Sequence, residues 1–347
     1  MKVNLVGFNH STGRGVGFYT EHLSQALQKK GVEITNKNPD LVHYPFFDLF
    51  YPTLRPHSCP TVITIHDLTP LVLPKMYPQG FRAKINLTLQ RLAIGNSRVI
   101  TDSHTSKKDL IRYFHLQDNQ ITVIPLAIDP TYYNKDTHAS SRAYSRGDPV
   151  SNLPPKFILY VGGANPNKNL ISLAKACETN NIPLVLVGSE FVKKPRETFS
   201  FKKLFSLQGT HPENETYLYL APKIEKGEII ALGFVPTEQL KVIYKKATVY
   251  VQPSYYEGFG LSLLEAMASK CLTLSSNQGS LSELKSDNSL IFEPFSQASL
   301  NQELKNALDL KEFVREKIVA SQFNKSKEYS WDLAAEQTLS VYKSLLK

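Results

Sequence analysis

The stretch "TVYVQPSYYEGFGLSLLEAMASKCLTLSS", residues 248–276, predicts a strand, a turn, a helix and a second strand in immediate succession. Residues 248–254 are rich in β-branched and aromatic side chains, which favour strands. A turn with two glycines leads into an apolar helix at 261–269, and 272–276 has the composition of the next strand. This order is typical of a βαβ unit, whose two strands run parallel in one sheet.

The same alternation of strands and helices extends in both directions along the chain. In the first half we expect strands at 2–8, 40–45, 61–67, 97–103 and 121–128, and helices after the glycine turn 12–17 and at 81–96 and 104–114. In the second half we expect further strands at 157–163, 183–188 and 228–234, and helices at 169–178 and 237–247. The sequence therefore predicts an α/β protein with two doubly wound, Rossmann-like domains.

The boundary between these domains is expected in a polar, serine- and proline-rich segment at 134–155, which lacks periodicity and has the composition of a linker. The predicted organisation is an N-terminal domain at 1–133, a C-terminal domain at 156–325 with an insertion at about 190–227, and a last helix at 326–347. Ligands bind at the carboxyl ends of the strands in such sheets, so we expect the two domains to face each other across a ligand-binding cleft.

Length and composition exclude several classes of protein. The 347 residues include 41% hydrophobic and 20% charged residues, which is ordinary for a globular chain. No apolar run approaches the roughly 18 residues of a membrane-spanning helix, and "MKVNLVGFNH" lacks the features of a signal peptide. The three cysteines have no CxxC spacing, which argues against a disulfide framework or a zinc site. We therefore expect a cytoplasmic location.

The net charge of +9 has its densest local source in "FVKKPRETFSFKKLFS", residues 191–206, where five basic residues alternate with phenylalanines. Such interleaving suits an anionic membrane surface or a single-stranded nucleic acid. A surface insertion without either partner is the favoured interpretation. The basic residues of two helices in the first half also allow peripheral association with an anionic membrane: Arg82, Lys84 and Arg91, then Lys107, Lys108 and Arg112.

Two glycine turns precede helices in positions where backbone N–H groups could bind phosphate. The first, "GRGVGF", contains Gly13, Gly15 and Gly17. It does not fit the G-x-G-x-x-G fingerprint, because Phe18 or Thr20 stands at the last glycine position. A nicotinamide-dependent dehydrogenase is therefore disfavoured.

The second turn, "EGFGLS", lies between Glu257 and Glu265, eight positions apart. A diphosphate on the free amides of this helix would leave one carboxylate for the hydroxyls on each of its two sides. A nucleotide sugar has this layout, with Glu265 suited to the ribose and Glu257 to the sugar. Two glutamates around a helix start are more often a cap and an exposed face, so the spacing alone is weak.

The surrounding sequence resembles the family 4 glycosyltransferases, retaining enzymes of the GT-B fold. "EGFGLSLLEAMA" is similar to the E-x7-E signature of that family, and "ILYVGGANPNKNL" to the start of its nucleotide-binding domain. Four N-terminal stretches resemble further motifs in the same order: "GRGVGFYTEHL", "TIHDLTPLVLP", "VITDSHTSKKDL" and "ITVIPLAIDP". The terminal "YSWDLAAEQTLSVYKSLL" resembles the helix that crosses back to the N-terminal domain.

The resemblance implies a role for each matched position. The resemblance implies that Glu265 binds the ribose, that Glu257 holds the donor sugar and that Lys168 neutralises the diphosphate. His66 would hydrogen-bond a sugar hydroxyl or the developing oxocarbenium ion. The backbone positions implied are Phe259, Gly260 and Leu261 at the diphosphate and sugar, Val235 at the base, and Gly15 and Gly17 at the phosphates.

The resemblance also implies a hexosyl transfer with retention from a UDP- or GDP-sugar to a glycan, lipid-linked or polysaccharide acceptor. The chain has no D-x-D motif, which fits a reaction without a metal, and no cofactor is expected beyond the nucleotide sugar. A specific nucleic-acid partner is not expected.

Some positions depart from the family pattern. Gly163 and Asn167 stand where many relatives have an arginine at the phosphates, and Ser262 where a proline is common. Two alternatives therefore stay open, namely a catalytically silent nucleotide-sugar binder and a GT-B epimerase or hydrolase.

Arg14, between Gly13 and Gly15, could supply the charge that these arginines would otherwise provide. We therefore expect a large loss of turnover in Arg14→Ala, measured as transfer of labelled sugar from the donor. Unchanged turnover in this variant would contradict the role.

Overall fold

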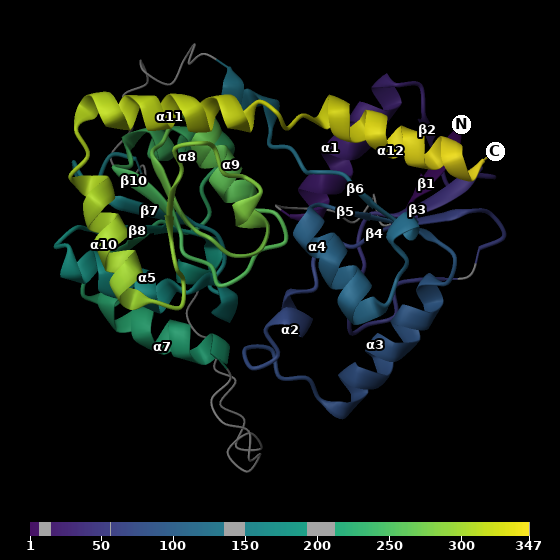
Figure 1. The fold of residues 1–347 in the computed structure, drawn as a ribbon, viewed down its shortest axis with the longest axis horizontal. Coiled ribbons are helices and arrows are strands. Elements are labelled where there is room, and N and C mark those ends of the chain that lie inside the picture. Colours follow the sequence, from purple (N-terminus) through teal and green to yellow (C-terminus); the bar gives the residue numbers. More distant parts are fainter. Residues whose placement is uncertain (7–14, 56, 135–149, 193–211, 347) are drawn as a thin grey trace. The chain divides into compact units, whose positions relative to one another are not determined.

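The computed structural model describes residues 1–6, 15–55, 57–134, 150–192 and 212–346, and Figure 1 shows its fold. The chain divides into two units by its internal contacts. The first unit contains residues 1–128, 257–261 and 328–347, and the second contains 129–256 and 262–327. The positively charged part of the 191–206 segment, from Lys193 onward, lies outside the described residues, as do Gly13 and Arg14.

The first unit is built on a parallel sheet of six strands in the order β2-β1-β3-β4-β5-β6. Its strands are β1 (Lys2–Leu5), β2 (Glu33–Ile34), β3 (Leu41–Tyr44), β4 (Thr61–Thr64), β5 (Arg98–Thr101) and β6 (Ile121–Val123). Its helices are α1 (Val16–Lys29), α2 (Thr69–Val72), α3 (Phe81–Ile94), α4 (His104–Asp109), which continues as a π-type turn at Leu110–Phe114, and α12 (Trp331–Leu345). Figure 1 shows α1 and α12 on one face of this sheet, and α3 and α4 on the other.

Helices cover both faces of the sheet, which explains why consecutive residues of β3, β4 and β5 are buried instead of every second one. The main core of the unit lies between the sheet and the helices α3 and α4, and includes Val42, Ile63, Val99, Leu110 and Phe114.

The last helix, α12, packs along α1 in the first unit, as the sequence predicted. At its start, the indole Nε1 of Trp331 donates to the carbonyl oxygen of Ile128 at 3.1 Å, and its ring stacks on His22 of α1. Near its end, the hydroxyl of Tyr342 lies 2.6 Å from Nδ1 of His43 in the central strand β3. Helix α12 is thus part of the same unit as the N-terminal strands.

The second unit has another parallel six-stranded sheet, in the order β12-β11-β10-β7-β8-β9. Its strands are β7 (Ile158–Val161), β8 (Leu184–Val187), β9 (Ile229–Ala231), β10 (Val249–Gln252), β11 (Thr273–Ser276) and β12 (Leu290–Phe292). The helices are α5 (Leu170–Thr179), α7 (Pro212–Glu225), α8 (Thr237–Lys246), α9 (Leu261–Ala268, whose first residue belongs to the first unit), α10 (Gln297–Leu308) and α11 (Glu312–Ser326). In Figure 1, α5 and α7 lie on one side of this sheet, and α8 and α9 on the other.

Both sheets confirm the predicted α/β class with two Rossmann-like halves. The helix α7 lies in the segment expected only as an insertion, and β12, α10 and α11 follow the last predicted strand. Within the described ranges, no helix is both long enough and apolar enough to span a bilayer.

His43 is the clearest buried titratable group of the first unit. Its side chain is fully buried in β3, and its Nε2 lies 2.7 Å from the hydroxyl oxygen of Thr64 in β4. Burial, with a smaller contribution from nearby His66, lowers the pKa of His43 to about 3. The imidazole is therefore neutral in the folded protein.

This burial predicts acid sensitivity. Between the unfolded pKa of 6.5 and the folded value of about 3, the unfolded chain binds one more proton at this site. The contribution of His43 to the free energy of unfolding therefore falls as the pH falls through this window, by up to about 1.4 kcal/mol per pH unit. Urea unfolding of the wild type and His43→Gln at several pH values measures the difference in slope, and equal slopes would contradict a neutral buried His43.

Candidate functional site

His66 and Asp102 form a buried pair at the carboxyl edge of the first sheet. His66 follows β4 and Asp102 follows the neighbouring strand β5, and the two strands are paired in parallel register. Nδ1 of His66 lies 2.8 Å from Oδ2 of Asp102, and Nε2 lies 3.1 Å from the carbonyl oxygen of Pro45. An imidazolium, which donates from both ring nitrogens, would satisfy both of these contacts.

The pKa of His66 reflects two opposing causes. Burial alone would lower it, but the charge and hydrogen bond of the Asp102 carboxylate outweigh burial, and the net direction is upward. Asp102 is itself buried, and its Oδ1 has no hydrogen-bond partner among the described residues. Burial raises the pKa of Asp102, against the opposing charge of His66.

This geometry narrows the role predicted for His66. An imidazolium can donate Nε2–H to a sugar hydroxyl in place of Pro45, but its charge cannot stabilise a positive oxocarbenium ion. Of the two predicted contacts, the structure therefore favours the hydroxyl. Asp102 was missed in the sequence, although a carboxylate directly after a strand that neighbours the histidine strand was a usable signal.

Helix α1, which begins after the predicted position Gly15 and contains the predicted position Gly17, contacts His66 through Tyr19, a residue that the sequence analysis did not single out. The ring of Tyr19 in α1 meets the His66 ring edge-on, with centroids 4.9 Å apart. The same helix begins after Gly15, whose φ of 84° lies in the left-handed region that favours glycine, and contains Gly17 in its first turn. Gly15 and Gly17 thus lie at the start of the helix that carries Tyr19.

The segment 257–261, which includes Glu257, Phe259, Gly260 and Leu261, also belongs to the first unit. Gly258 packs so closely on the His66 strand end that a Cβ there would lie 2.6 Å from Cβ of Asp67. The hydroxyl of Ser106 is 3.0 Å from the carbonyl oxygen of His66 and 3.4 Å from that of Gly258. The residue after Glu257 therefore lies directly against the histidine loop.

In the second unit, the strand order places a topological switch point between β7 and β10. The loop after β7 carries Lys168 at the end of a short 3-10 turn, Pro166–Lys168. The side-chain amide of Asn167 donates to the carbonyl oxygen of Tyr256 at 2.9 Å, and the backbone N–H of Tyr255 donates back to that of Asn167 at 2.8 Å. Asn167 thus ties the lysine loop to the loop that leads into Glu257.

Glu265 of α9 is held by a neighbouring helix. The hydroxyl of Tyr244 in α8 donates to its Oε2 at 3.0 Å and also lies 3.2 Å from the carbonyl oxygen of Ser262. Val235 is buried in the loop between β9 and α8. The structure therefore places Lys168, Glu265 and Val235 in the second unit, all in or after loops that follow strands of its sheet.

The side chain of Glu190 lies next to Gly163, one of the two positions where the family resemblance implies an arginine. A Cβ at Gly163 would lie 3.2 Å from Oε2 of Glu190, and the same oxygen accepts the backbone N–H of Ala164 at 2.6 Å. A carboxylate therefore occupies the side of the turn where the family resemblance places a cation.

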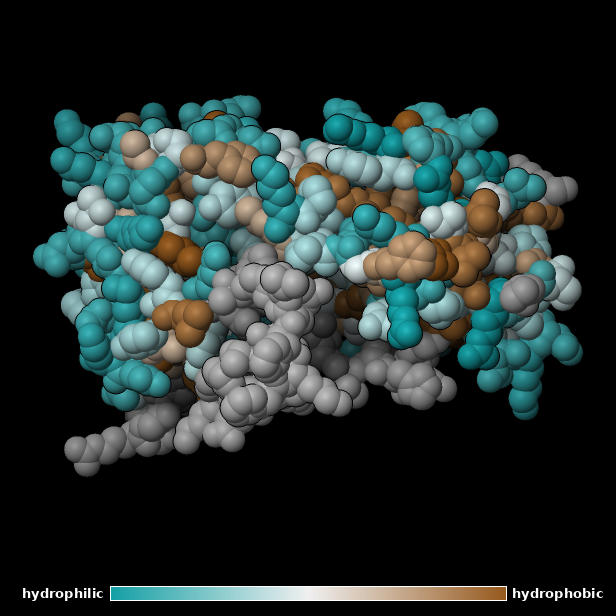
Figure 2. Space-filling model, turned by 90° about the horizontal axis from the view of Figure 1, so that it is seen from below, coloured by the Kyte–Doolittle hydropathy of each residue, from teal (hydrophilic) through white to brown (hydrophobic). Residues whose placement is uncertain are grey.

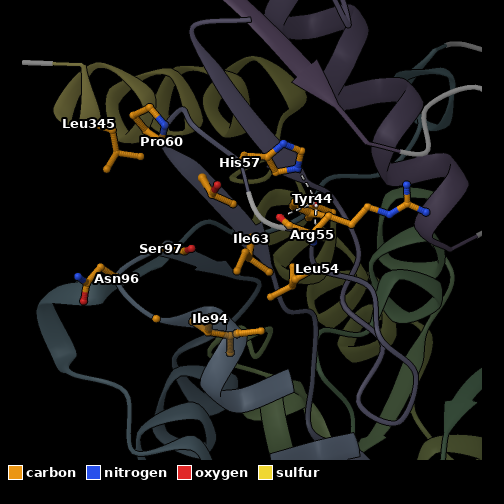
Figure 3. A pocket seen from close by; sticks show the side chains of 13 residues that line it. Tyr44, Leu54, Arg55, His57, Pro60, Ile63, Ile94, Asn96, Ser97 and Leu345 are labelled. Atoms are coloured by element: carbon orange, nitrogen blue, oxygen red, sulfur yellow. Dashed lines mark hydrogen bonds between the residues drawn. The ribbon is translucent and has the colours of Figure 1, made fainter. Parts of the chain in front are cut away.

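A pocket of about 440 Å³ opens elsewhere in the first unit (Figure 3). Its walls include Pro60 and Thr61 at the beginning of β4, and Asn96 and Ser97 just before β5. These residues lie at the amino ends of the strands, opposite the edge that carries His66 and Asp102. The pocket contains none of the predicted site residues.

Sequence profiles of two families match the chain. The profile described as "Glycosyl transferases group 1" matches residues 142–322, more than half of the chain. The chain belongs to the group 1 glycosyltransferases. "Glycosyltransferase Family 4" matches residues 34–132 of this glycosyltransferase.

Two relatives from Escherichia coli are named as mannosyltransferases. The O-antigen chain mannosyltransferase B is 26% identical over 294 residues, which cover 82% of this chain and 70% of that protein. The serotype-specific mannosyltransferase WbdA is 26% identical over 337 residues. This match covers 93% of this chain but only 39% of the length of WbdA.

Solved structures share the fold over nearly the whole chain. Sucrose-phosphate synthase from Thermosynechococcus elongatus gives a TM-score of 0.74 at 18% identity, with 99% of this chain and 98% of that chain covered. HepE from Anabaena in complex with UDP-glucose gives a TM-score of 0.68 at 15% identity, with 99% and 100% covered. The fold of this glycosyltransferase is GT-B.

Asp102 predicts a test of the His66 pair. In Asp102→Asn the burial of His66 is opposed only by the smaller contributions of Asp67 and the Pro45 carbonyl, so the pKa of His66 should fall. Sugar transfer at neutral pH should then fall at least about tenfold, because the ring loses both a proton and its fixed orientation.

Histidine NMR titration measures the pKa, and a transfer assay across pH measures the activity. Asp118→Asn is the matched control, because Asp118 is an exposed carboxylate of the same unit that pairs with Lys107 at the surface. A His66 pKa that is the same in Asp102→Asn and in the wild type would contradict the assignment of Asp102 as a positioning residue.

Proposed function

We propose that this glycosyltransferase moves a hexosyl group from a UDP- or GDP-sugar to a glycan, lipid-linked or polysaccharide acceptor, with retention and without a metal. The observation that carries the proposal is the switch point of the second unit. There the loop with Lys168 and the loop before α9 start from neighbouring parallel strands and are joined through Asn167. Crevices of this kind bind nucleotides in doubly wound sheets.

The residues at this edge suit the parts of a nucleotide sugar. The Glu265 carboxylate, oriented by Tyr244, can accept both hydroxyls of a ribose. The Lys168 ammonium and the N–H groups at the start of α9 can neutralise a diphosphate. The HepE structure of the same fold holds UDP-glucose, which supports this class of donor.

The reaction proposed is departure of the nucleoside diphosphate from the anomeric carbon. Negative charge grows on the leaving oxygens, so Lys168 and the α9 amides stabilise the transition state more than the ground state. The leaving phosphate can take the proton of the acceptor hydroxyl as that hydroxyl attacks from the same face. Glu257 and His66 are proposed to hold the hydroxyls of the transferred sugar.

Two further points support the finer assignment. Both E. coli relatives are named as mannosyltransferases, one of them for an O-antigen chain, which favours mannose as the sugar and a bacterial surface polysaccharide as the acceptor.

All three cysteines are free thiols, and two of them are buried, which supports a reducing, cytoplasmic location. The basic helices of the first unit support peripheral association with an anionic membrane.

A catalytically silent nucleotide-sugar binder is the second candidate, and Glu190 is the observation that favours it. A carboxylate next to the phosphate-binding turn weakens the attraction for a diphosphate. A silent binder would bind the donor without releasing nucleoside diphosphate, whereas an epimerase or hydrolase would consume the donor without an acceptor.

Thermal unfolding in the presence of nucleotides tests the donor site. The wild type should be stabilised by about 2.7 kcal/mol at a hundred times the dissociation constant of UDP, GDP or their sugar conjugates. Glu265→Ala should lose most of this stabilisation while it keeps its fold, because Tyr244 retains the Ser262 carbonyl as a partner.

Glu316→Ala on the exposed face of α11 is the control and should respond as the wild type does. Equal stabilisation of the wild type and Glu265→Ala would show that the nucleotide binds elsewhere. No stabilisation by any nucleotide would remove the proposed donor site altogether.

A further inference from the structure

The outer face of α3 carries a stripe of exposed apolar side chains. Phe81 is 80% exposed, Ile85 45%, Leu89 56% and Leu92 73%. Their spacing of four, four and three residues places them in one row along the helix. A soluble surface helix ordinarily turns such a row toward the core, so this row lacks its expected cover.

The helix cannot turn the stripe inward, because its opposite face is fastened. Gln90 is buried, and its Nε2 donates to the carbonyl oxygens of Asp48 and Tyr51 at 2.6 and 2.7 Å. The amide of Asn86, on the same inner face, donates to the carbonyl oxygen of Phe50 at 2.8 Å. These three bonds fix the rotation of α3 about its axis, and with it the outward position of the stripe.

The charges around the stripe have one sign. Arg82 and Lys84 are exposed and flank the row on its two sides at helical spacing. From Leu68 to Thr101 the chain contains no Asp or Glu, so no carboxylate on α3 or beside it in sequence neutralises them. Figure 2 views the molecule from the side on which α3 lies in Figure 1, and shows a brown apolar area bordered by teal in that part of the first unit.

We propose that α3 is a docking helix for an anionic lipid bilayer, with Phe81, Ile85, Leu89 and Leu92 inserted among the acyl chains and Arg82 and Lys84 at the phosphate level. A single convex row between two cations matches a flat, negatively charged surface with an apolar interior. This inference deepens the proposed function, on which it rests for the membrane-associated acceptor, since it names the surface through which the enzyme meets its membrane.

A second copy of the chain is a poorer occupant of this face. In a symmetric dimer the same patch meets itself, so the Arg82 and Lys84 side chains of both copies would come together around the contact. Like charges of this kind oppose association, whereas the anionic lipid headgroups attract them.

Vesicle flotation of the full chain at low salt tests the proposal. The wild type should float with vesicles of equal parts phosphatidylglycerol and phosphatidylcholine, and much less with phosphatidylcholine alone. Phe81→Ser/Leu92→Ser should weaken binding to the anionic vesicles at least about tenfold. Arg82→Gln/Lys84→Gln should weaken it by about tenfold and reduce its dependence on salt.

The matched control is Phe313→Ser/Val314→Ser on α11. These side chains are 66% and 41% exposed, but acidic and basic residues both surround them, including Glu312, Glu316 and Lys317, which lies over the Phe313 ring. The control should float as the wild type does. Equal flotation of the wild type and Phe81→Ser/Leu92→Ser would overturn the proposal, and so would absence of wild-type flotation.

Light scattering without vesicles completes the test. A wild-type dimer that Phe81→Ser/Leu92→Ser converts to a monomer would assign the stripe to a second copy and overturn the proposal. Flotation needs no nucleotide, so its result is independent of the donor. We expect Phe81→Ser/Leu92→Ser to lose flotation and to keep the thermal response of the wild type to nucleotides. If the wild type floats but no nucleotide stabilises it, the proposed function is refuted and α3 remains a membrane-docking helix.

Discussion

Parallel pairing between β7 and β10 is the constraint on which the candidate donor site depends. Because Val249 pairs with Ile158 and Tyr250 with Leu159, both strands deliver their following loops to the same edge of the sheet. The two loops then bond to each other through Asn167, which stands at one of the two positions where the family resemblance implies an arginine. Compared with an arginine, the neutral amide of Asn167 adds no positive charge to the proposed phosphate site. Its hydrogen bond instead fixes the geometry of the loop before Glu257.

The sequence was sufficient for most of the fold, because its strands are short, apolar and regularly separated by helices. It was insufficient for α7, α10 and α11, which follow weaker patterns near the insertion and after the last predicted strand. In the site, Lys168, Glu257 and Glu265 stood out through their motif. Asp102, Glu190 and Tyr244 did not, since each acts on a residue distant in sequence, and such contacts depend on strand order and side-chain direction.

The two units distribute charge in opposite ways. In the first, the Asp102 carboxylate keeps a cation on His66, and in the second, Glu190 lies beside the turn that should receive an anion. In the proposed donor site, Lys168 and the amides at the α9 start are then the described groups that would attract a diphosphate. A site of the proposed composition would hold its donor through several moderate contacts rather than through one strong ion pair.

The contact between Tyr342 and His43 has a consequence for the order of events on the ribosome. The strands of the first unit emerge before the second unit during synthesis, yet β3 buries a histidine whose Nδ1 partner, Tyr342, follows 299 residues later. Until that tyrosine leaves the exit tunnel, Nδ1 of His43 lacks this partner, although Thr64 of the same sheet can already contact Nε2. Domains usually fold in the order of translation. Here the second unit can fold before α12 is available to complete the first.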